Sequence, residues 1–183
     1  MDLGLKDKVA IITGGSDGIG KAAAISMAAE GAKVAIVGRT QSKLDAAIAE
    51  IKEVSNGEAI GISTDVSVES DVQSMVDEVI SQYGQIDILV NNAGTSSATT
   101  LEEMTDEDLR VDFGIKIYGA VYCARAVLPH LKKSDAGVII NTTTPGGKAS
   151  GPGGQPTSLS LSLIHISEPT RRYAISYAVF CLK

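Results

Sequence analysis

Short apolar runs alternate with longer amphipathic stretches along the first 140 residues. The apolar runs, too short for buried helices, are rich in β-branched residues and predict strands covered on both faces: residues 9–12, 34–37, 86–90 and 138–140, with a weaker fifth run at 59–62. The amphipathic stretches predict helices: residues 19–29, 41–54, 68–83 and 106–131. This alternation predicts right-handed crossovers and an α/β fold, a doubly wound parallel sheet of Rossmann type that stops after about five strands.

The regular alternation ends in the last third of the chain. Residues 145–156 hold three prolines and five glycines, a composition typical of a loop. Beyond Ser160 a parallel sheet needs another helix and another strand, and we expect neither there.

At the start of the third predicted helix, Ser67 is the expected N-cap, because its hydroxyl can accept from a backbone N–H of the first turn.

Composition and net charge exclude several classes of function. The 183 residues suit one domain, and 16 basic against 22 acidic residues give a net charge of −6. This balance argues against a general nucleic-acid binder, which needs a basic face. Cys123 and Cys181 make no disulfide framework, and no Cys/His cluster has metal-ligand spacing. No apolar run has the length of a membrane span or a signal core, so we expect a cytoplasmic protein without membrane contact.

A glycine-rich turn follows the first predicted strand. Residues 13–20 read Thr-Gly-Gly-Ser-Asp-Gly-Ile-Gly and lead into an alanine-rich helix. Glycines let the backbone turn tightly and approach a pyrophosphate, whose charge a helix N-terminus stabilises. The glycine spacing differs from the common Gly-x-Gly-x-x-Gly fingerprint, and a purely structural turn is the alternative.

Three motifs in order resemble the short-chain dehydrogenase/reductase family from about residue 5 to residue 160. They are the Thr-Gly-x-x-x-Gly-x-Gly turn, an acidic position after the third strand and the Asn-Asn-Ala-Gly sequence after the fourth. Asp65 alone could equally be a turn residue or a helix cap. The resemblance implies a cofactor site made of Gly14, Ser16, Asp17, Gly18, Ile19, Gly20, Asp65, Val66, Asn92, Ala93 and Gly94.

The end of the second strand bears on the choice of cofactor. A carboxylate there would bind the ribose 2′-hydroxyl of NAD, whereas an arginine suits the 2′-phosphate of NADP. The chain has Gly38-Arg39-Thr40, so we expect Arg39 and Thr40 to favour NADP, with NAD possible. Asp17 argues slightly against NADP, because many NADP-preferring relatives carry a basic residue there, and a solvated surface arginine is the alternative for Arg39.

The catalytic positions depart from the family. The resemblance implies a Tyr with a Lys four residues later, a Ser thirteen residues before that Tyr, and an Asn on the fourth long helix. No Tyr-x-x-x-Lys occurs; Thr144 takes the Ser position, Thr157 the Tyr position and Lys116 the Asn position. A different acid, Tyr118 or Lys116, and a nucleotide-binding pseudoenzyme both stay open. An aliphatic hydroxyl is too weak an acid to replace a phenol by itself.

The last 23 residues resemble a translated sequencing-library adapter. Residues 161–171 and 175–182 match, codon by codon, the two ends of such an adapter, with residues 172–174 as a sample index. An ordinary helical tail is the alternative. We therefore expect a truncated NADP-binding domain over residues 1–160 and a non-native tail over 161–183. The resemblance implies an oxidoreductase that acts on a small carbonyl or alcohol substrate and that is a homo-oligomer in its full-length parent. We expect this truncated chain to be inactive.

Overall fold

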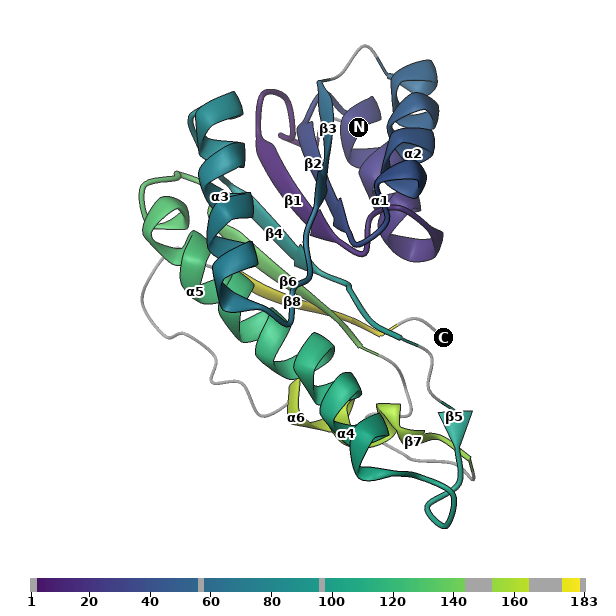
Figure 1. The fold of residues 1–183 in the computed structure, drawn as a ribbon. Coiled ribbons are helices and arrows are strands. Elements are labelled where there is room, and N and C mark those ends of the chain that lie inside the picture. Colours follow the sequence, from purple (N-terminus) through teal and green to yellow (C-terminus); the bar gives the residue numbers. More distant parts are fainter. Residues whose placement is uncertain (1–2, 56–57, 96–97, 144–152, 165–175, 182–183) are drawn as a thin grey trace.

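A six-stranded parallel sheet forms the centre of the computed structural model, which describes residues 3–55, 58–95, 98–143, 153–164 and 176–181. Its strands lie side by side in the order β3, β2, β1, β4, β6, β8 (Figure 1). Their bounds are Ala59–Ser63, Lys33–Gly38, Val9–Thr13, Ile88–Asn91, Val138–Thr143 and Ser176–Cys181. The doubly wound α/β fold and its five predicted strands are confirmed, and β8 is added to them.

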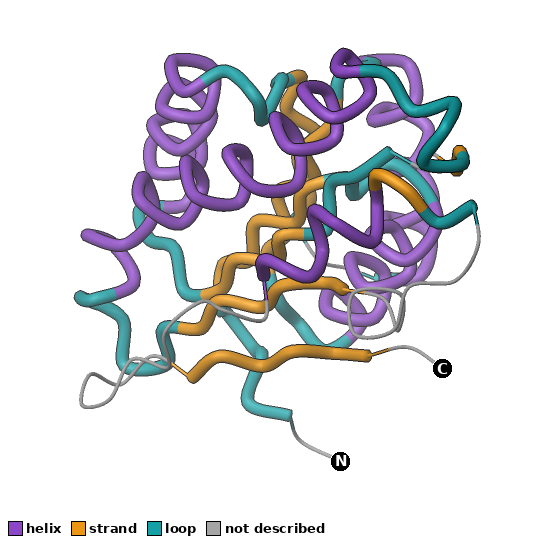
Figure 2. Tube along the Cα trace, turned by 90° about the horizontal axis from the view of Figure 1, so that it is seen from below, coloured by secondary structure: helices purple, strands orange, loops and turns teal. Residues whose placement is uncertain are grey.

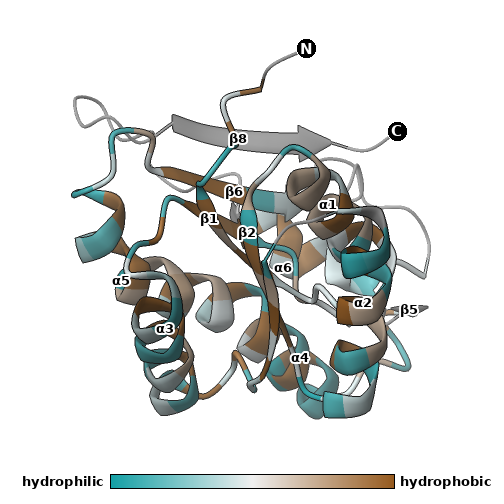
Figure 3. Cartoon of the chain, turned by 90° about the horizontal axis from the view of Figure 1, so that it is seen from above, coloured by the Kyte–Doolittle hydropathy of each residue, from teal (hydrophilic) through white to brown (hydrophobic). Residues whose placement is uncertain are grey.

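Helices cover both faces of this sheet, because successive strand residues point to opposite sides. Ile12 of β1 packs with α1 (Gly18–Ala29) and α2 (Gln41–Val54). Its neighbour Ile11 packs on the other face with α3 (Glu69–Tyr83) and α5 (Gly119–Leu131). Both isoleucines are fully buried. Figure 3 shows hydrophobic strands between the helices, and outer surfaces of α2 and α3 that are mostly hydrophilic.

The fourth predicted helix is interrupted. It consists of α4 (Asp106–Phe113), a π-helical turn η1 (Gly114–Tyr118) and α5. A π turn adds a residue to the helical repeat and is frequent at functional sites.

The predicted N-cap of α3 is wrong: the cap is Val68, whereas the Ser67 hydroxyl donates to Asp65 Oδ1 at 2.6 Å. Ser67 therefore braces the turn before the helix instead of capping it.

The expectation that neither helix nor strand follows Ser160 is wrong. The helix α6 spans Thr157–Ile164, and β8 pairs in parallel with β6 (Figure 2). The sequence of β8, Ser-Tyr-Ala-Val-Phe-Cys, is rich in residues that favour strands, and it satisfies the backbone groups along the edge of β6. A separate pair, β5 (Ala98–Thr99) and β7 (Gln155–Pro156), is antiparallel.

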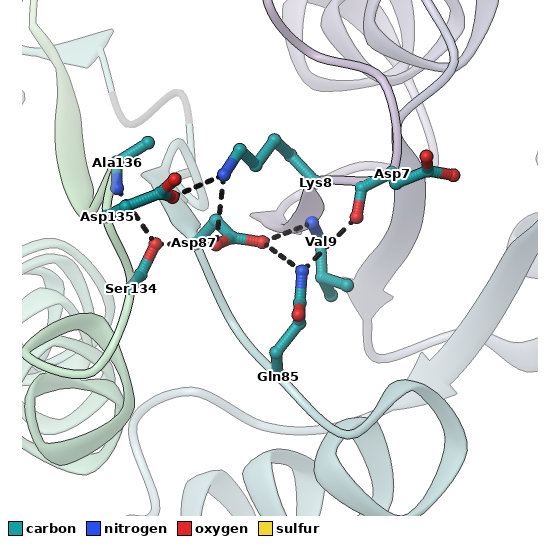
Figure 4. Close-up of polar contacts among 8 residues, drawn as sticks. All are labelled: Asp7, Lys8, Val9, Gln85, Asp87, Ser134, Asp135 and Ala136. Atoms are coloured by element: carbon teal, nitrogen blue, oxygen red, sulfur yellow. Dashed lines mark hydrogen bonds and ion pairs between the residues drawn. The ribbon is translucent and has the colours of Figure 1, made fainter.

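A buried carboxylate holds the amino ends of the strands together (Figure 4). Asp87, just before β4, accepts from the Val9 backbone N–H at 2.8 Å and from Gln85 Nε2 at 2.9 Å. The Ser134 hydroxyl donates to its other oxygen at 2.5 Å, and Lys8 Nζ lies 4.0 Å away. Asp87 thus links β1, β4 and the connection from α5 to β6, at the end of the sheet opposite the glycine-rich turn.

The described residues contain neither a membrane-spanning helix nor a candidate metal site. Within them no helix is long and apolar enough to cross a membrane. No group of three or more His, Cys, Asp or Glu residues among them could hold a metal ion.

Candidate nucleotide-binding site

The glycine-rich turn joins β1 to α1 at the carboxyl end of the sheet. Gly14 has a φ of +65°, which L side chains rarely adopt. Gly20 lies directly beneath it, and a Cβ on Gly20 would come within 2.3 Å of the Gly14 carbonyl oxygen. Asp17 caps α1 by accepting from the Gly18 N–H at 2.7 Å. The turn therefore brings closely packed backbone to the helix N-terminus, where an anion is stabilised.

A cavity of about 490 Å³ opens in front of this turn. Most of the predicted cofactor residues line it, namely Gly14, Ser16, Asp17, Gly18, Arg39, Thr40, Val66, Asn92, Ala93 and Gly94. The lining also includes Val37, Gly38, Lys43, Thr64, Thr95 and Ile115, which the motifs do not mark. Three of the predicted cofactor residues, Ile19, Gly20 and Asp65, do not line it. The structure thus brings the glycine turn, the end of β2 and the Asn-Asn-Ala-Gly turn around one cavity.

Hydrogen bonds from the Asn-Asn-Ala-Gly turn fix the glycine turn in place. The Asn92 and Ala93 backbone N–H groups donate to Thr13 Oγ1 at 2.9 and 3.0 Å. Asn92 Nδ2 donates to the carbonyl oxygens of Thr13, at 3.1 Å, and Gly14, at 3.3 Å. Asn92 and Thr13 therefore hold the turn in shape, and sequence reasoning missed Thr13, although the family motif begins with it.

Two cations line the cavity where β2 ends. Arg39 and Lys43 are exposed, and neither makes an ion pair with another residue in the described part of the chain. Among the described residues of the lining, Asp17 carries the one carboxylate. Arg39 also lines a neighbouring hollow of about 270 Å³, together with Asp65 and Ser67. The bond from Ser67, and more weakly the charge of Arg39, hold the pKa of Asp65 below its usual range.

A buried ion pair lies beside this cavity. Lys116, in η1, places Nζ 2.5 Å from Asp112 Oδ1 and 2.8 Å from Thr157 Oγ1. Both partners of the ion pair are buried, with side-chain exposures of 5% and 1%. The Ser160 hydroxyl donates to the second carboxylate oxygen, Asp112 Oδ2, at 2.5 Å. The structure thus brings the predicted Lys116 and Thr157 together, and adds Asp112, which no sequence motif indicated.

A comparison with models of protein families shows the family of the chain. The family model described as short chain dehydrogenase matches residues 8–158. This chain belongs to the short chain dehydrogenase family. It is 36% identical over 143 residues to an uncharacterised oxidoreductase of Staphylococcus epidermidis, covering 78% of this chain and 60% of the relative. It is 38% identical over 141 residues to the meso-2,3-butanediol dehydrogenase of Serratia marcescens, covering 77% and 55% respectively.

Solved structures of the family superpose closely on this chain. A short chain dehydrogenase from Bacillus anthracis matches with a TM-score of 0.89 and 32% identity, covering 96% of this chain and 73% of that one. L-sorbose reductase from Gluconobacter frateurii, solved with NADPH and L-sorbose, matches with a TM-score of 0.88 and 32% identity, covering 93% and 65%. NAD⁺-bound xylitol dehydrogenase matches with a TM-score of 0.83 and 30% identity, covering 87% and 62%. The chain spans about 60% of the length of the first curated relatives that it matches.

Two further candidate residues from the sequence are Thr144 and Tyr118. Thr144, predicted at the position of the family's serine, lies outside the described residues. Tyr118 is 56% exposed and does not line the cavity, and its ring lies 6.1 Å from that of Tyr122.

Burial raises the pKa of the Cys123 thiol to about 12, so this cysteine is not a nucleophile near neutral pH.

Proposed function

We propose that the complete protein is an NADP(H)-dependent oxidoreductase that interconverts a small carbonyl compound and its alcohol. One observation carries the proposal: the glycine turn at the N-terminus of α1 opens on a cavity that also holds Arg39. The family, in which two of the solved relatives hold NAD⁺ and NADPH, supports a nicotinamide dinucleotide as the ligand.

The residues present fit such a ligand. The backbone of Gly14 packs so closely on α1 that a Cβ on Gly20 would come within 2.3 Å of the Gly14 carbonyl oxygen. The first backbone N–H groups of a helix have no partner within the helix, and we assign those of α1 to the diphosphate. We assign the diphosphate to Gly14, Ser16 and Gly18, the adenosine end to Asp65 and Val66, and the nicotinamide end to Asn92, Ala93 and Gly94. When bound, the nicotinamide supplies the hydride chemistry, and the protein supplies its position.

Arg39 favours NADP over NAD in this proposal. A guanidinium stays charged and binds phosphate through paired hydrogen bonds, and the exposed Arg39 makes no ion pair with a described residue, although its charge acts weakly on Asp65. Thr40 and Lys43 line the same part of the cavity. Asp17 opposes the preference through its negative charge, but its carboxylate already accepts from Gly18.

Replacing Arg39 tests the preference directly. Arg39→Ala should weaken NADPH binding about tenfold or more, and NADH binding by less than about twofold, because only NADPH carries the 2′-phosphate. Isothermal titration measures both affinities, and Arg125→Ala, an exposed arginine paired with Glu69, is the matched control. Equal losses of affinity for the two coenzymes would refute the assignment.

We propose a nucleotide-binding protein without turnover as the second candidate. The observation in its favour is Thr157 at the position of the family's tyrosine, with a neutralised ion pair beside it. Binding of NADPH by the complete protein, without oxidation in the presence of any carbonyl compound in a panel, would favour this candidate. Turnover would favour the enzyme.

We further propose that residues 161–183 are translated adapter and that this chain is inactive as it stands. Its parent would then be a cytoplasmic homo-oligomer, with no nucleic-acid or membrane partner. Sequencing the source locus from a library without adapters tests the first point, and genomic codons for residues 161–183 would overturn it.

A further inference from the structure

A second, much smaller cavity adjoins the cavity in front of the glycine-rich turn. Its volume is about 20 Å³, and Val66, Ala93 and Ile115 line both cavities. The other residues around it come from β1, β4, η1, α5, β6 and α6. A cavity of about 10–15 Å³ or more can hold one water molecule. This cavity therefore has room for one water molecule and for no larger ligand.

Asn91, the last residue of β4, lines this small cavity and is only 9% exposed. Its Nδ2 donates to the Ala120 carbonyl oxygen at 3.4 Å and to Asn141 Oδ1 at 3.0 Å. Because a carbonyl oxygen only accepts, the bond to Ala120 identifies the nitrogen end of the Asn91 amide. The other end, Oδ1, is buried and has no hydrogen-bond partner among the described residues. A buried acceptor without a partner is costly, and ordered water commonly supplies the missing bond.

Lys116 lines the same cavity and has a donor to spare. Its ammonium ion carries three N–H groups, of which one donates to Asp112 and one to Thr157. The third has no acceptor in the part of the chain that the structure describes. The Lys116 side chain is only 5% exposed, so bulk water has little access to it. The lining thus includes one residue with an unused acceptor and one with an unused donor.

Two other side chains in the lining compete little for a bound water. The Thr13 hydroxyl already donates to the Val90 carbonyl oxygen and accepts from the backbone N–H groups of Asn92 and Ala93. Burial raises the pKa of the Cys123 thiol to about 12, so it stays protonated, and a thiol is a weak hydrogen-bonding group. Asn91 and Lys116 therefore offer the strongest bonds to a molecule in this cavity.

We propose that the small cavity binds one ordered water molecule, which accepts from Lys116 Nζ and donates to Asn91 Oδ1. Buried cavities that stay dry are apolar, whereas a buried water needs two or more polar partners, and these two residues supply them. The water would join η1 to the end of β4, directly before the Asn-Asn-Ala-Gly turn. The inference concerns how the folded chain is held together at this point, and it does not depend on the proposed coenzyme.

A crystal structure of this chain tests the site directly. Electron density for one water molecule is expected in the cavity, about 2.7–3.2 Å from both Asn91 Oδ1 and Lys116 Nζ. A cavity without such density would overturn the proposal. A protein group that moves in and donates to Asn91 Oδ1 would overturn it as well.

The same site can be tested in solution. Magnetic relaxation dispersion of ¹⁷O-labelled water counts the long-lived internal water molecules of this chain. Asn91→Leu, which keeps the size of the side chain and removes the acceptor, should lower that count by one. Gln73→Leu is the matched control, because it removes an exposed amide of α3 that bonds Asp77, and its count should equal that of the wild type.

An unchanged count in a folded Asn91→Leu variant would contradict the assignment of the water to Asn91. Circular dichroism establishes whether the variant is folded. The crystal structure of the wild-type chain decides the question independently, whether or not the variant folds.

Discussion

Asp87 offers the sharpest test of how the sheet is held together. Its carboxylate accepts from a buried backbone N–H at Val9, from Gln85 and from Ser134 (Figure 4). Asp87→Ala removes all three bonds and leaves the Val9 N–H without its acceptor. A buried donor left unsatisfied costs about 1–3 kcal/mol, and hydrogen bonds to a charged group contribute about 1.5–3 kcal/mol each. Allowing for relaxation and for water entering the gap, we expect a loss of about 3 kcal/mol.

The loss can be measured by thermal unfolding. For a chain of this size, about 3 kcal/mol lowers the Tm by about 6–12 °C. Asp87→Asn retains an oxygen that can accept from Val9, and its loss should be smaller. Asp135→Ala is the matched control: its side chain is 85% exposed and bonds the same Lys8, so its Tm should match that of the wild type. An Asp87→Ala variant with the Tm of this control would refute the reasoning.

Two further predictions concern packing and pH. Gly20→Ala should weaken NADPH binding more than about tenfold in a fluorescence titration, because its Cβ would displace the Gly14 carbonyl oxygen. Ala22→Ser, on the exposed face of α1, is the control. An unchanged NADPH affinity in Gly20→Ala would contradict the close approach of Gly20 to Gly14. Burial, and secondarily the charge of Glu58, raise the pKa of Tyr83 to about 12. Its contribution to stability is therefore full below pH 10 and is lost as the pH rises towards 12. Tyr83→Phe should show a smaller loss of stability over that range in urea titrations. At pH 7 it should cost nothing, since the buried Tyr83 hydroxyl has no hydrogen-bond partner among the described residues. A destabilised Tyr83→Phe variant at pH 7 would show that this hydroxyl is bonded.

The strands and the cavity in front of the glycine-rich turn could be predicted because their signals are local. Runs such as residues 34–37 are apolar and β-branched, and the structure buries them between two layers of helices. The spacing of its glycines makes the glycine-rich turn recognisable in the sequence, and a cavity opens in front of it. In both cases a short stretch of sequence contains the physical reason for its structure.

The missed features depend on residues far apart in the sequence. Thr13 acts through Asn92, and Lys116 meets Thr157 only because η1 and α6 pack together. Asp112 precedes Lys116 by one helical turn, a spacing that is common for exposed ion pairs, so nothing local marks this pair as buried. The strand β8 was missed for another reason: its partner β6 supplies the edge on which it pairs.

The central claim is that the turn from Gly14 to Gly20 and the side chain of Arg39 together bind a phosphorylated nicotinamide dinucleotide. Titration calorimetry of this chain with NADPH and with NADH tests that claim most directly. We predict saturable binding of one NADPH per chain, tighter than that of NADH. No detectable heat of binding with either coenzyme, from a chain that circular dichroism shows to be folded, would contradict it.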